Sequence, residues 1–252
     1  MQEKIIDVNN LKVNYKTFWD IWKQVFLILH GWWGSSDSWV EIANLLSKDF
    51  FVVVPDLPWF WNTSLDKVYT LENYANFVKD FLEKLNIKEV ILLWHSNGWA
   101  ISICLSWKIR VKKLILNNSA WIRKKVKTSL KRKLFWFFVK PLKFLRKLPW
   151  WEKLRIIFYK LIDSRDYLDA EKNSFKKQTF LNIINTDLQD KIKNIKKTTL
   201  LIWWRYDTYT PLEDWKKIHK LIKNSKLEIL DSTHGIHLKK PKELVETILN
   251  WI

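Results

Sequence analysis

Residues 93–100 read Leu93-Trp94-His95-Ser96-Asn97-Gly98-Trp99-Ala100. With glycine in place of Trp94, this run would match G-x-S-x-G, the sharp strand-to-helix turn that exposes a reactive serine. As printed, only Gly98 of the two motif glycines is present. The pattern predicts a nucleophile at Ser96, and it makes the neighbouring tryptophans a feature that needs an explanation.

The tryptophan content is anomalous and mirrors a shortage of glycine. The chain has 18 tryptophans and 4 glycines, whereas ordinary usage of about 7% would give roughly 18 glycines. Several tryptophans stand at turn-like sites, as in Phe18-Trp19-Asp20 and Pro58-Trp59-Phe60, where glycine is favoured because it tolerates positive φ. Our hypothesis is that UGA codons, which some bacterial lineages read as glycine, are printed here as tryptophan. The alternative is genuine tryptophan, for example in an aromatic binding surface.

This hypothesis assigns a codon to most of the tryptophans. UGA is expected where a turn or close packing favours glycine: Trp19, Trp22, Trp33, Trp59, Trp61, Trp94, Trp99, Trp107, Trp121, Trp204 and Trp215. UGG is expected where the context accepts tryptophan: Trp32, Trp39, Trp203 and Trp251. The contexts of Trp136, Trp150 and Trp151 favour neither codon. The Lys-, Ile- and Asn-rich composition is typical of an AT-rich genome, in which UGA codons are favoured.

Length and composition fit one domain with an insertion. A chain of 252 residues is long enough to bury a large core. The single cysteine, Cys104, excludes an intrachain disulfide and is compatible with a reducing compartment. The first residues lack the form of a signal peptide, and no apolar run approaches about 18 residues, so we expect a cytoplasmic protein. We find no metal-spaced cluster of Cys and His and expect neither a metal nor a cofactor.

Strands and helices are expected to alternate along the chain. Strands are predicted at residues 5–8, 12–17, 25–29, 51–54, 90–93, 114–116, 199–203 and 227–230. Helices are predicted at residues 38–47, 71–85, 100–107, 211–222 and 241–252, and a basic helical section interrupts the pattern before residue 198. The alternation predicts the α/β class, with a mainly parallel sheet covered by helices on both faces.

Taken in order, these motifs resemble those of the α/β-hydrolase superfamily over essentially the whole chain. Beside the turn at Ser96, a second segment resembles the family's oxyanion loop: Leu29-His30-Gly31-Trp32-Trp33-Gly34-Ser35-Ser36-Asp37-Ser38-Trp39. Residues 29–39 are called the oxyanion loop. Pro55-Asp56-Leu57-Pro58 resembles the turn after the family's fourth strand. The resemblance implies an α/β-hydrolase core in two parts, residues 1–121 and 198–252, with a helical cap inserted at residues 122–197.

The chemistry of such an enzyme needs three side chains. A serine hydroxyl is a poor nucleophile unless a base takes its proton, and a carboxylate must orient that base. The family's chain order is Ser, then Asp or Glu, then His. By the resemblance, these roles fall to Ser96, Asp207, which follows the predicted strand 199–203, and His234, which follows the predicted strand 227–230.

Other residues are expected to support this triad. The resemblance places the oxyanion hole at the backbone N–H groups of Trp32 and Asn97. Asp231 is a rival acid, although it lies too near His234 in the sequence to match the family's arrangement, and Asp207 could instead only cap the helix that follows it. Structural rather than catalytic roles are expected for three further side chains: His30, His237 and Cys104.

The expected reaction is acyl transfer from a small-molecule substrate to water through an acyl-serine intermediate. Carboxylic ester hydrolysis is the favoured class, and C–C bond hydrolysis of a diketo acid, peptide or amide cleavage and lipid acyl hydrolysis stay open. A serine nucleophile argues against the dehalogenase and epoxide-hydrolase branches, which use aspartate. The opposing class is a non-catalytic, hydrolase-like binding protein, and a complete triad weighs against it.

The formal net charge of +18 is large and unevenly distributed. Residues 122–160 are rich in Lys and Arg and carry one acidic residue, Glu152, while apolar side chains are interleaved among the basic ones. Such a basic amphipathic stretch could lie on an anionic membrane. It could also cover an active site with its apolar side, which we prefer. Nucleic acid is not expected as a partner, and the sequence does not decide the oligomeric state.

Overall fold

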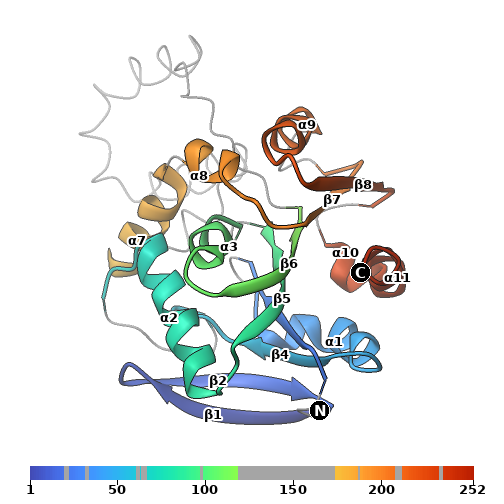
Figure 1. The fold of residues 1–252 in the computed structure, drawn as a ribbon. Coiled ribbons are helices and arrows are strands. Elements are labelled where there is room, and N and C mark those ends of the chain that lie inside the picture. Colours follow the sequence, from blue (N-terminus) through green and yellow to red (C-terminus); the bar gives the residue numbers. More distant parts are fainter. Residues whose placement is uncertain are drawn as a thin grey trace, which may run out of the picture.

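A computed structural model shows how the chain folds (Figure 1). It describes residues 1–19, 23–31, 34–60, 63, 67–96, 99–118, 174–186, 188–207, 212–232 and 235–252. Within these residues, the centre of the molecule is an eight-stranded sheet with the order β1-β2-β4-β3-β5-β6-β7-β8. Its strands are β1 (Gln2–Val8), β2 (Leu11–Phe18), β3 (Val25–Leu29), β4 (Phe51–Pro55), β5 (Glu89–His95), β6 (Arg110–Asn117), β7 (Thr199–Trp204) and β8 (Ser225–Leu230).

The sheet is parallel except at one end. β1 pairs with β2, and β2 with β4, in antiparallel fashion, whereas all other neighbours are parallel. The central strands are apolar on both faces, because helices cover both faces of a parallel sheet. The predicted α/β fold with a mainly parallel sheet is confirmed. The carboxyl ends of its parallel strands lie at one edge, where side chains that follow the strands can converge.

Helices cover both faces of the sheet (Figure 1). One hydrophobic core lies under α1 (Val40–Leu46), α10 (Ile236–Lys239) and α11 (Pro241–Leu249). The other core lies under α2 (Leu71–Lys84), α3 (Trp99–Ser106), α7 (Ser174–Asn185), α8 (Gln189–Lys193) and α9 (Leu212–Leu221). In the described part of the chain, no helix combines the length and the apolarity that crossing a bilayer requires.

Helix α2 shows how local sequence sets an element. The side chain of Thr70 accepts a hydrogen bond from the backbone N–H of Asn73, and the Asn73 side chain accepts one from the N–H of Thr70. This reciprocal capping box satisfies two backbone donors at the start of the helix. Tyr74, Phe77 and Phe81 then recur on the buried side at helical spacing. These side chains share a hydrophobic core with β5, the strand that ends just before Ser96.

The structure adds elements that the sequence did not predict. A short 3-10 helix, η1 (Ser36–Trp39), ends the oxyanion loop, and α10 follows the segment that contains His234. Helices α7 and α8 belong to the range expected for the cap, and the Thr179 side chain accepts a hydrogen bond of 2.8 Å from the N–H of Tyr69. The rest of the expected cap, up to residue 173, lies outside the described residues.

Candidate active site

Ser96 lies in the sharp turn between β5 and α3. Its φ angle is +58°, in the left-handed region that a residue with a side chain rarely adopts. The strand before it ends at His95, and α3 begins at Trp99, so the chain reverses within a few residues. Strain of this kind persists only where the surroundings enforce it, and it concentrates at functional sites. The side chain of Ser96 is half-buried at the carboxyl edge of the sheet.

The oxyanion loop packs directly against this turn. A Cβ built on Gly31 would lie 2.9 Å from the Cβ of Ser96 and 3.0 Å from the carbonyl oxygen of His95, so no side chain fits at residue 31. The backbone N–H of Gly34 donates to the carbonyl of Gly31 at 3.0 Å, which holds together the two glycines that flank positions 32 and 33. The predicted oxyanion residues, Trp32 and Asn97, lie outside the described residues.

His30 braces the loop, as the sequence suggested. Its side chain is buried, and its Nε2 accepts a hydrogen bond of 3.0 Å from the backbone N–H of Leu57, in the turn after β4. Because Nε2 is the acceptor, the proton of the neutral ring lies on Nδ1, which is 2.9 Å from the carbonyl oxygen of Gly31. Burial lowers the pKa of His30, and it outweighs the opposing effects of the Gly31 carbonyl and Asp56.

Asp207 follows β7 at the same edge of the sheet as Ser96. Its backbone N–H donates to the carbonyl of Trp204 at 3.2 Å, and its side chain is half-buried. The backbone N–H of the preceding residue, Tyr206, donates to the carbonyl of Ser232 at 3.1 Å. This hydrogen bond joins the loop of Asp207 to the segment just before residue 234. His234 itself lies outside the described residues.

Asp231, the rival acid, is engaged elsewhere. Its Oδ1 lies 2.6 Å from Nε of Arg205, and both side chains are more than half exposed. The hydrogen bond with Asp231 raises the pKa of Arg205. The backbone carbonyl of Asp231 also accepts a hydrogen bond of 3.0 Å from Lys240. The ion pair with Arg205 holds the Asp231 carboxylate at a solvent-exposed site. This favours Asp207 over Asp231 as the acid of the proposed triad.

An aromatic cluster that the sequence analysis did not predict joins η1, the end of β5 and α10 beside the turn. Trp39, at the end of the oxyanion loop, stacks on His237 of α10 with the ring centroids 4.6 Å apart and the planes 9° from parallel. His95, directly before Ser96, lies 5.7 Å from Trp39 and 4.6 Å from His237 between ring centroids. The only sequence signal for this cluster is that both histidines lie close to proposed catalytic residues.

Eight tryptophans of the described chain fall into two groups. Trp19 and Trp59 have φ angles of +67° and +78°, a conformation that glycine adopts without steric cost. Five buried indole N–H groups find no acceptor within the described residues: those of Trp59, Trp94, Trp203, Trp204 and Trp215. A buried donor without an acceptor costs about 1–3 kcal/mol. Trp203, for which the sequence favours UGG, belongs to this group as well.

The two tryptophans of the other group have no positive φ and no orphaned buried N–H within the described residues, and both make ring contacts. Trp39 is fully buried in the cluster with His95 and His237. Trp251 carries the Lys113 ammonium over its ring at 4.9 Å from the centroid. Both were assigned UGG from the sequence, and both have a packing role that glycine would abolish.

Two further features bear on the chemistry of the site. Over the residues that the structure places, no group of three or more His, Cys, Asp or Glu side chains is arranged to hold a metal ion.

Cys104 is buried on α3, as expected, and burial raises the pKa of its thiol even though Lys191 Nζ lies 3.4 Å from its sulfur. A buried thiol with a raised pKa is a poor nucleophile, so Ser96 is the better candidate.

Known proteins resemble this chain over nearly all of its length. A family model described as "alpha/beta hydrolase fold" matches residues 24–241. The uncharacterized hydrolase YugF of Bacillus subtilis (strain 168) is 25% identical, over 97% of this chain and 96% of YugF. The monoacylglycerol lipase ABHD6 of Mus musculus is 24% identical, over 91% of this chain and 76% of that protein. A thermophilic esterase from Thermogutta terrifontis superimposes with a TM-score of 0.73 at 18% identity, over 100% of this chain and 98% of the esterase, and at that identity the likeness shows the fold alone.

Proposed function

This chain is a hydrolase that belongs to the α/β-hydrolase fold family, and we propose that it cleaves a carboxylic ester through an acyl intermediate on Ser96. The observation that carries the proposal is the backbone of Ser96. Its φ of +58°, between a buried strand and a helix, is the strained turn that presents a nucleophile in this fold. No such strain is needed for a serine that only ends a strand.

The proposed reaction has two steps. In the first, Ser96 Oγ attacks the ester carbonyl while His234 takes the hydroxyl proton and then gives it to the leaving alcohol. In the second, His234 takes a proton from the water that attacks the acyl-serine, and it returns this proton to Ser96 Oγ as the C–O bond breaks and the carboxylic acid leaves. Asp207 orients the imidazole and stabilises its protonated form, and the N–H groups of Trp32 and Asn97 stabilise the negative oxygen of each tetrahedral intermediate.

The positions of the described residues support these roles. Ser96 follows β5 and Asp207 follows β7, so both lie at the carboxyl edge of the sheet. The hydrogen bond from the N–H of Tyr206 to the carbonyl of Ser232 brings together the chain just before Asp207 and the chain just before His234. Gly31 holds the oxyanion loop at van der Waals distance from Ser96.

The choice of a carboxylic ester rests on a relative and on the chemistry of serine. The bond that a monoacylglycerol lipase cleaves is a carboxylic ester, and ABHD6 carries that name and covers 91% of this chain. A short synthetic ester and an acylglycerol present the same reacting bond to Ser96. We also propose that residues 122–197 form the cap that selects between them, with its apolar side toward the substrate.

The proposal is tested on the form of the chain with glycine at the expected UGA positions, by measuring hydrolysis of p-nitrophenyl acetate, p-nitrophenyl butyrate and a monoacylglycerol. Turnover should be lost in Ser96→Ala. Ser106→Ala is the matched control, because Ser106 lies on α3 and its hydroxyl donates to the helix carbonyl of Ile103 at 2.8 Å. Esterase activity that persists in Ser96→Ala would contradict the assignment of the nucleophile.

A further inference from the structure

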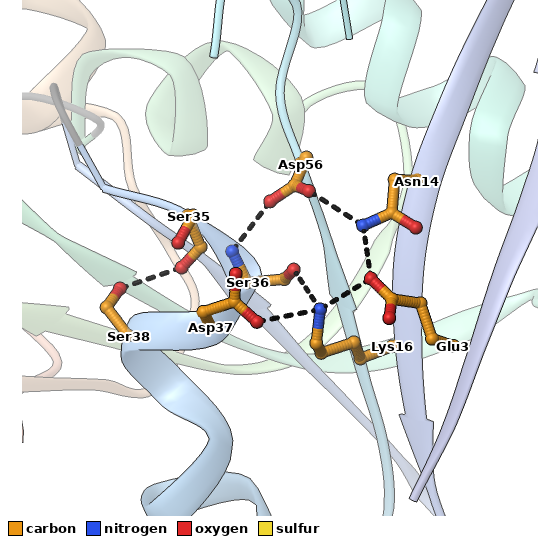
Figure 2. A network of polar contacts seen from close by, with 8 residues as sticks. All are labelled: Glu3, Asn14, Lys16, Ser35, Ser36, Asp37, Ser38 and Asp56. Carbon is orange, nitrogen blue, oxygen red and sulfur yellow. Dashed lines mark hydrogen bonds and ion pairs between the residues drawn. The ribbon is translucent and has the colours of Figure 1, made fainter. Parts of the chain in front are cut away.

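A closed network of polar side chains lies beneath the oxyanion loop (Figure 2). Lys16, on β2, is only 3% exposed. Its ammonium nitrogen lies 2.8 Å from Glu3 Oε1, 2.9 Å from Asp37 Oδ1 and 3.2 Å from Ser36 Oγ. An ammonium group has three N–H donors, and these three partners occupy all of them. Two of the three, Ser36 and Asp37, belong to the oxyanion loop.

The second half of the network is built around Asp56, in the turn after β4. The side chain is fully buried, and its Oδ1 accepts a hydrogen bond of 2.6 Å from the backbone N–H of Ser36. Its Oδ2 accepts a hydrogen bond of 3.0 Å from Asn14 Nδ2, which also donates to Glu3 at 2.8 Å. The contacts therefore form a ring that joins the β1–β2 hairpin, the oxyanion loop and the β4 turn, as Figure 2 shows.

The charges of this ring make Lys16 its central member. Burial disfavours the charged form of Lys16, but the hydrogen bonds and ion pairs with Glu3 and Asp37 outweigh burial and raise its pKa. The hydrogen bond from Lys16 is the main reason that the pKa of Glu3 is lowered. Lys16 is the one ammonium among three carboxylates, those of Glu3, Asp37 and Asp56, in the network that the structure describes. Without it, the half-exposed carboxylates of Glu3 and Asp37 would lose the cation that holds them together, and they would repel one another near the buried Asp56.

The ring lies a few residues from the catalytic contact. Ser36 is two residues after Gly34, whose N–H donates to Gly31, and Gly31 packs against Ser96. An oxyanion donor is effective only within about 2.7–3.1 Å of the developing charge, and a site must be held to about 0.5 Å. A network that fixes the loop at Ser36 and Asp37 therefore helps to keep the oxyanion donor of the loop at the distance that catalysis requires.

We propose that Lys16 is a positioning residue that holds the oxyanion loop against Ser96 through Ser36 and Asp37. This inference rests on the proposed function, because it assigns the loop to the reaction of that same site. Lys16 does not touch the substrate. Its role is to neutralise and orient the acidic side chains that surround the base of the loop.

The experiment compares Lys16→Met with Lys12→Met. Lys12 is on the same strand, but it is exposed and lies 3.9 Å from an equally exposed Asp7, so its loss should change nothing. In Lys16→Met, kcat for p-nitrophenyl butyrate should fall roughly 10-fold or more, since loss of a whole oxyanion donor costs about 10²–10³, while KM stays within about twofold. The inhibition constant of a boronic acid, which mimics the tetrahedral intermediate, should rise in the same proportion as kcat falls. Lys16→Arg, which keeps the charge, should recover part of the loss.

Hydrogen–deuterium exchange of the peptide over residues 30–40, measured without substrate, separates this inference from the proposed function. Exchange should accelerate in Lys16→Met and not in Lys12→Met. If the wild-type protein shows no turnover that depends on Ser96, the proposed function fails, and the exchange result still decides whether Lys16 holds the loop. If Lys16→Met does not fold, Asp37→Asn, whose side chain is 59% exposed, must show the same changes. The inference is overturned if the variant that folds has the same kcat, the same boronic acid affinity and the same exchange rate over residues 30–40 as the wild type.

Discussion

Gly31 and Ser96 touch across the candidate active site. The α-carbon of Gly31 faces the Cβ of Ser96 so closely that an added methyl group would stand 2.9 Å from it. The backbone of the oxyanion loop at Gly31 therefore lies directly against the Cβ of Ser96 and the carbonyl oxygen of His95, with no room for a side chain at residue 31. This contact requires glycine at residue 31.

Gly31→Ala should reduce activity far more than it reduces folding. The new methyl group must push the oxyanion loop away from Ser96 or the carbonyl of His95, and a displacement of about 1 Å at an active site can cost about 10²-fold in rate. The control is Gly235→Ala, since a Cβ there meets nothing within 4 Å and its φ of −102° is ordinary. Steady-state kinetics and thermal melts check both variants. Equal kcat in Gly31→Ala and wild type would show that the contact has no catalytic consequence.

The two candidate acids can be told apart by a matched pair of substitutions. Asp207→Asn should lower kcat strongly, by about 10⁴-fold if the carboxylate acts as it does in the serine protease triad. Asp231→Asn should lower it little, because Asp231 pairs with Arg205 at an exposed site and such pairs contribute about 0–1 kcal/mol. The measurement is kcat for p-nitrophenyl butyrate. The reverse order of effects would assign the acid to Asp231.

His30 should make the protein less stable in acid. Burial lowers its pKa in the folded state below the ordinary value of 6.5, so the unfolded chain takes up a proton at a pH where the native His30 stays neutral. The stabilisation is complete above pH 6.5 and is lost as the pH falls toward the native pKa. His30→Gln keeps a donor and an acceptor but does not titrate. Between pH 8 and pH 5, its Tm should fall less than that of the wild type, and parallel curves would contradict this role.

The backbone of Trp19 allows a direct test of the hypothesis that many of these tryptophans are glycine in the native protein. Trp19 has a φ of +67° and is 64% exposed, and a left-handed conformation costs a residue with a side chain about 1–2 kcal/mol. In the chain that already has glycine at the other expected UGA positions, Trp19→Gly should therefore raise Tm by a few degrees, about 2–4 °C per kcal/mol for a chain of this size, despite losing the contact with Lys23 at 5.2 Å. Trp251→Gly, which loses the contact with Lys113, should lower Tm. A lower Tm in Trp19→Gly would contradict the proposal at that position.

The gene sequence decides the same proposal directly. UGA is expected at Trp94 and Trp99, which flank Ser96, and UGG is expected at Trp39 and Trp251. Expressed with tryptophan at every printed position, the chain should be insoluble or molten, whereas the form with glycine at the UGA positions should be soluble and melt cooperatively. UGG at Trp94 and Trp99 would refute the recoding hypothesis, as would a cooperative and active all-tryptophan protein.

Sequence patterns predicted most of the core, because buried parallel strands are short apolar runs with a strong local signal. The strand at residues 25–29 agrees with β3 at both ends, and the predicted helix 71–85 agrees with α2 to within one residue. The four-residue helix α10 was missed, because so short a segment has no periodicity of its own. It is formed by the packing of Ile236 into the core.

The polar support of the site could not be predicted in the same way. Lys12, Asn14 and Lys16 alternate with apolar residues along β2, a pattern typical of a solvent-facing side. In the structure, Asn14 and Lys16 are buried, because their partners are brought to them by other parts of the chain. Asp37 and Asp56 lie far from Lys16 in the sequence, and no local pattern records that they will meet.

The most direct test of the central claim is to treat the protein with a fluorophosphonate and locate the adduct by mass spectrometry. A fluorophosphonate phosphonylates a serine only where a base and an oxyanion site activate it. The account predicts one adduct per chain, on the peptide that contains Ser96, with loss of esterase activity in proportion to labelling and no adduct in Ser96→Ala. An unlabelled wild-type protein, or an adduct on another residue that survives in Ser96→Ala, would contradict the claim that Ser96 is the nucleophile.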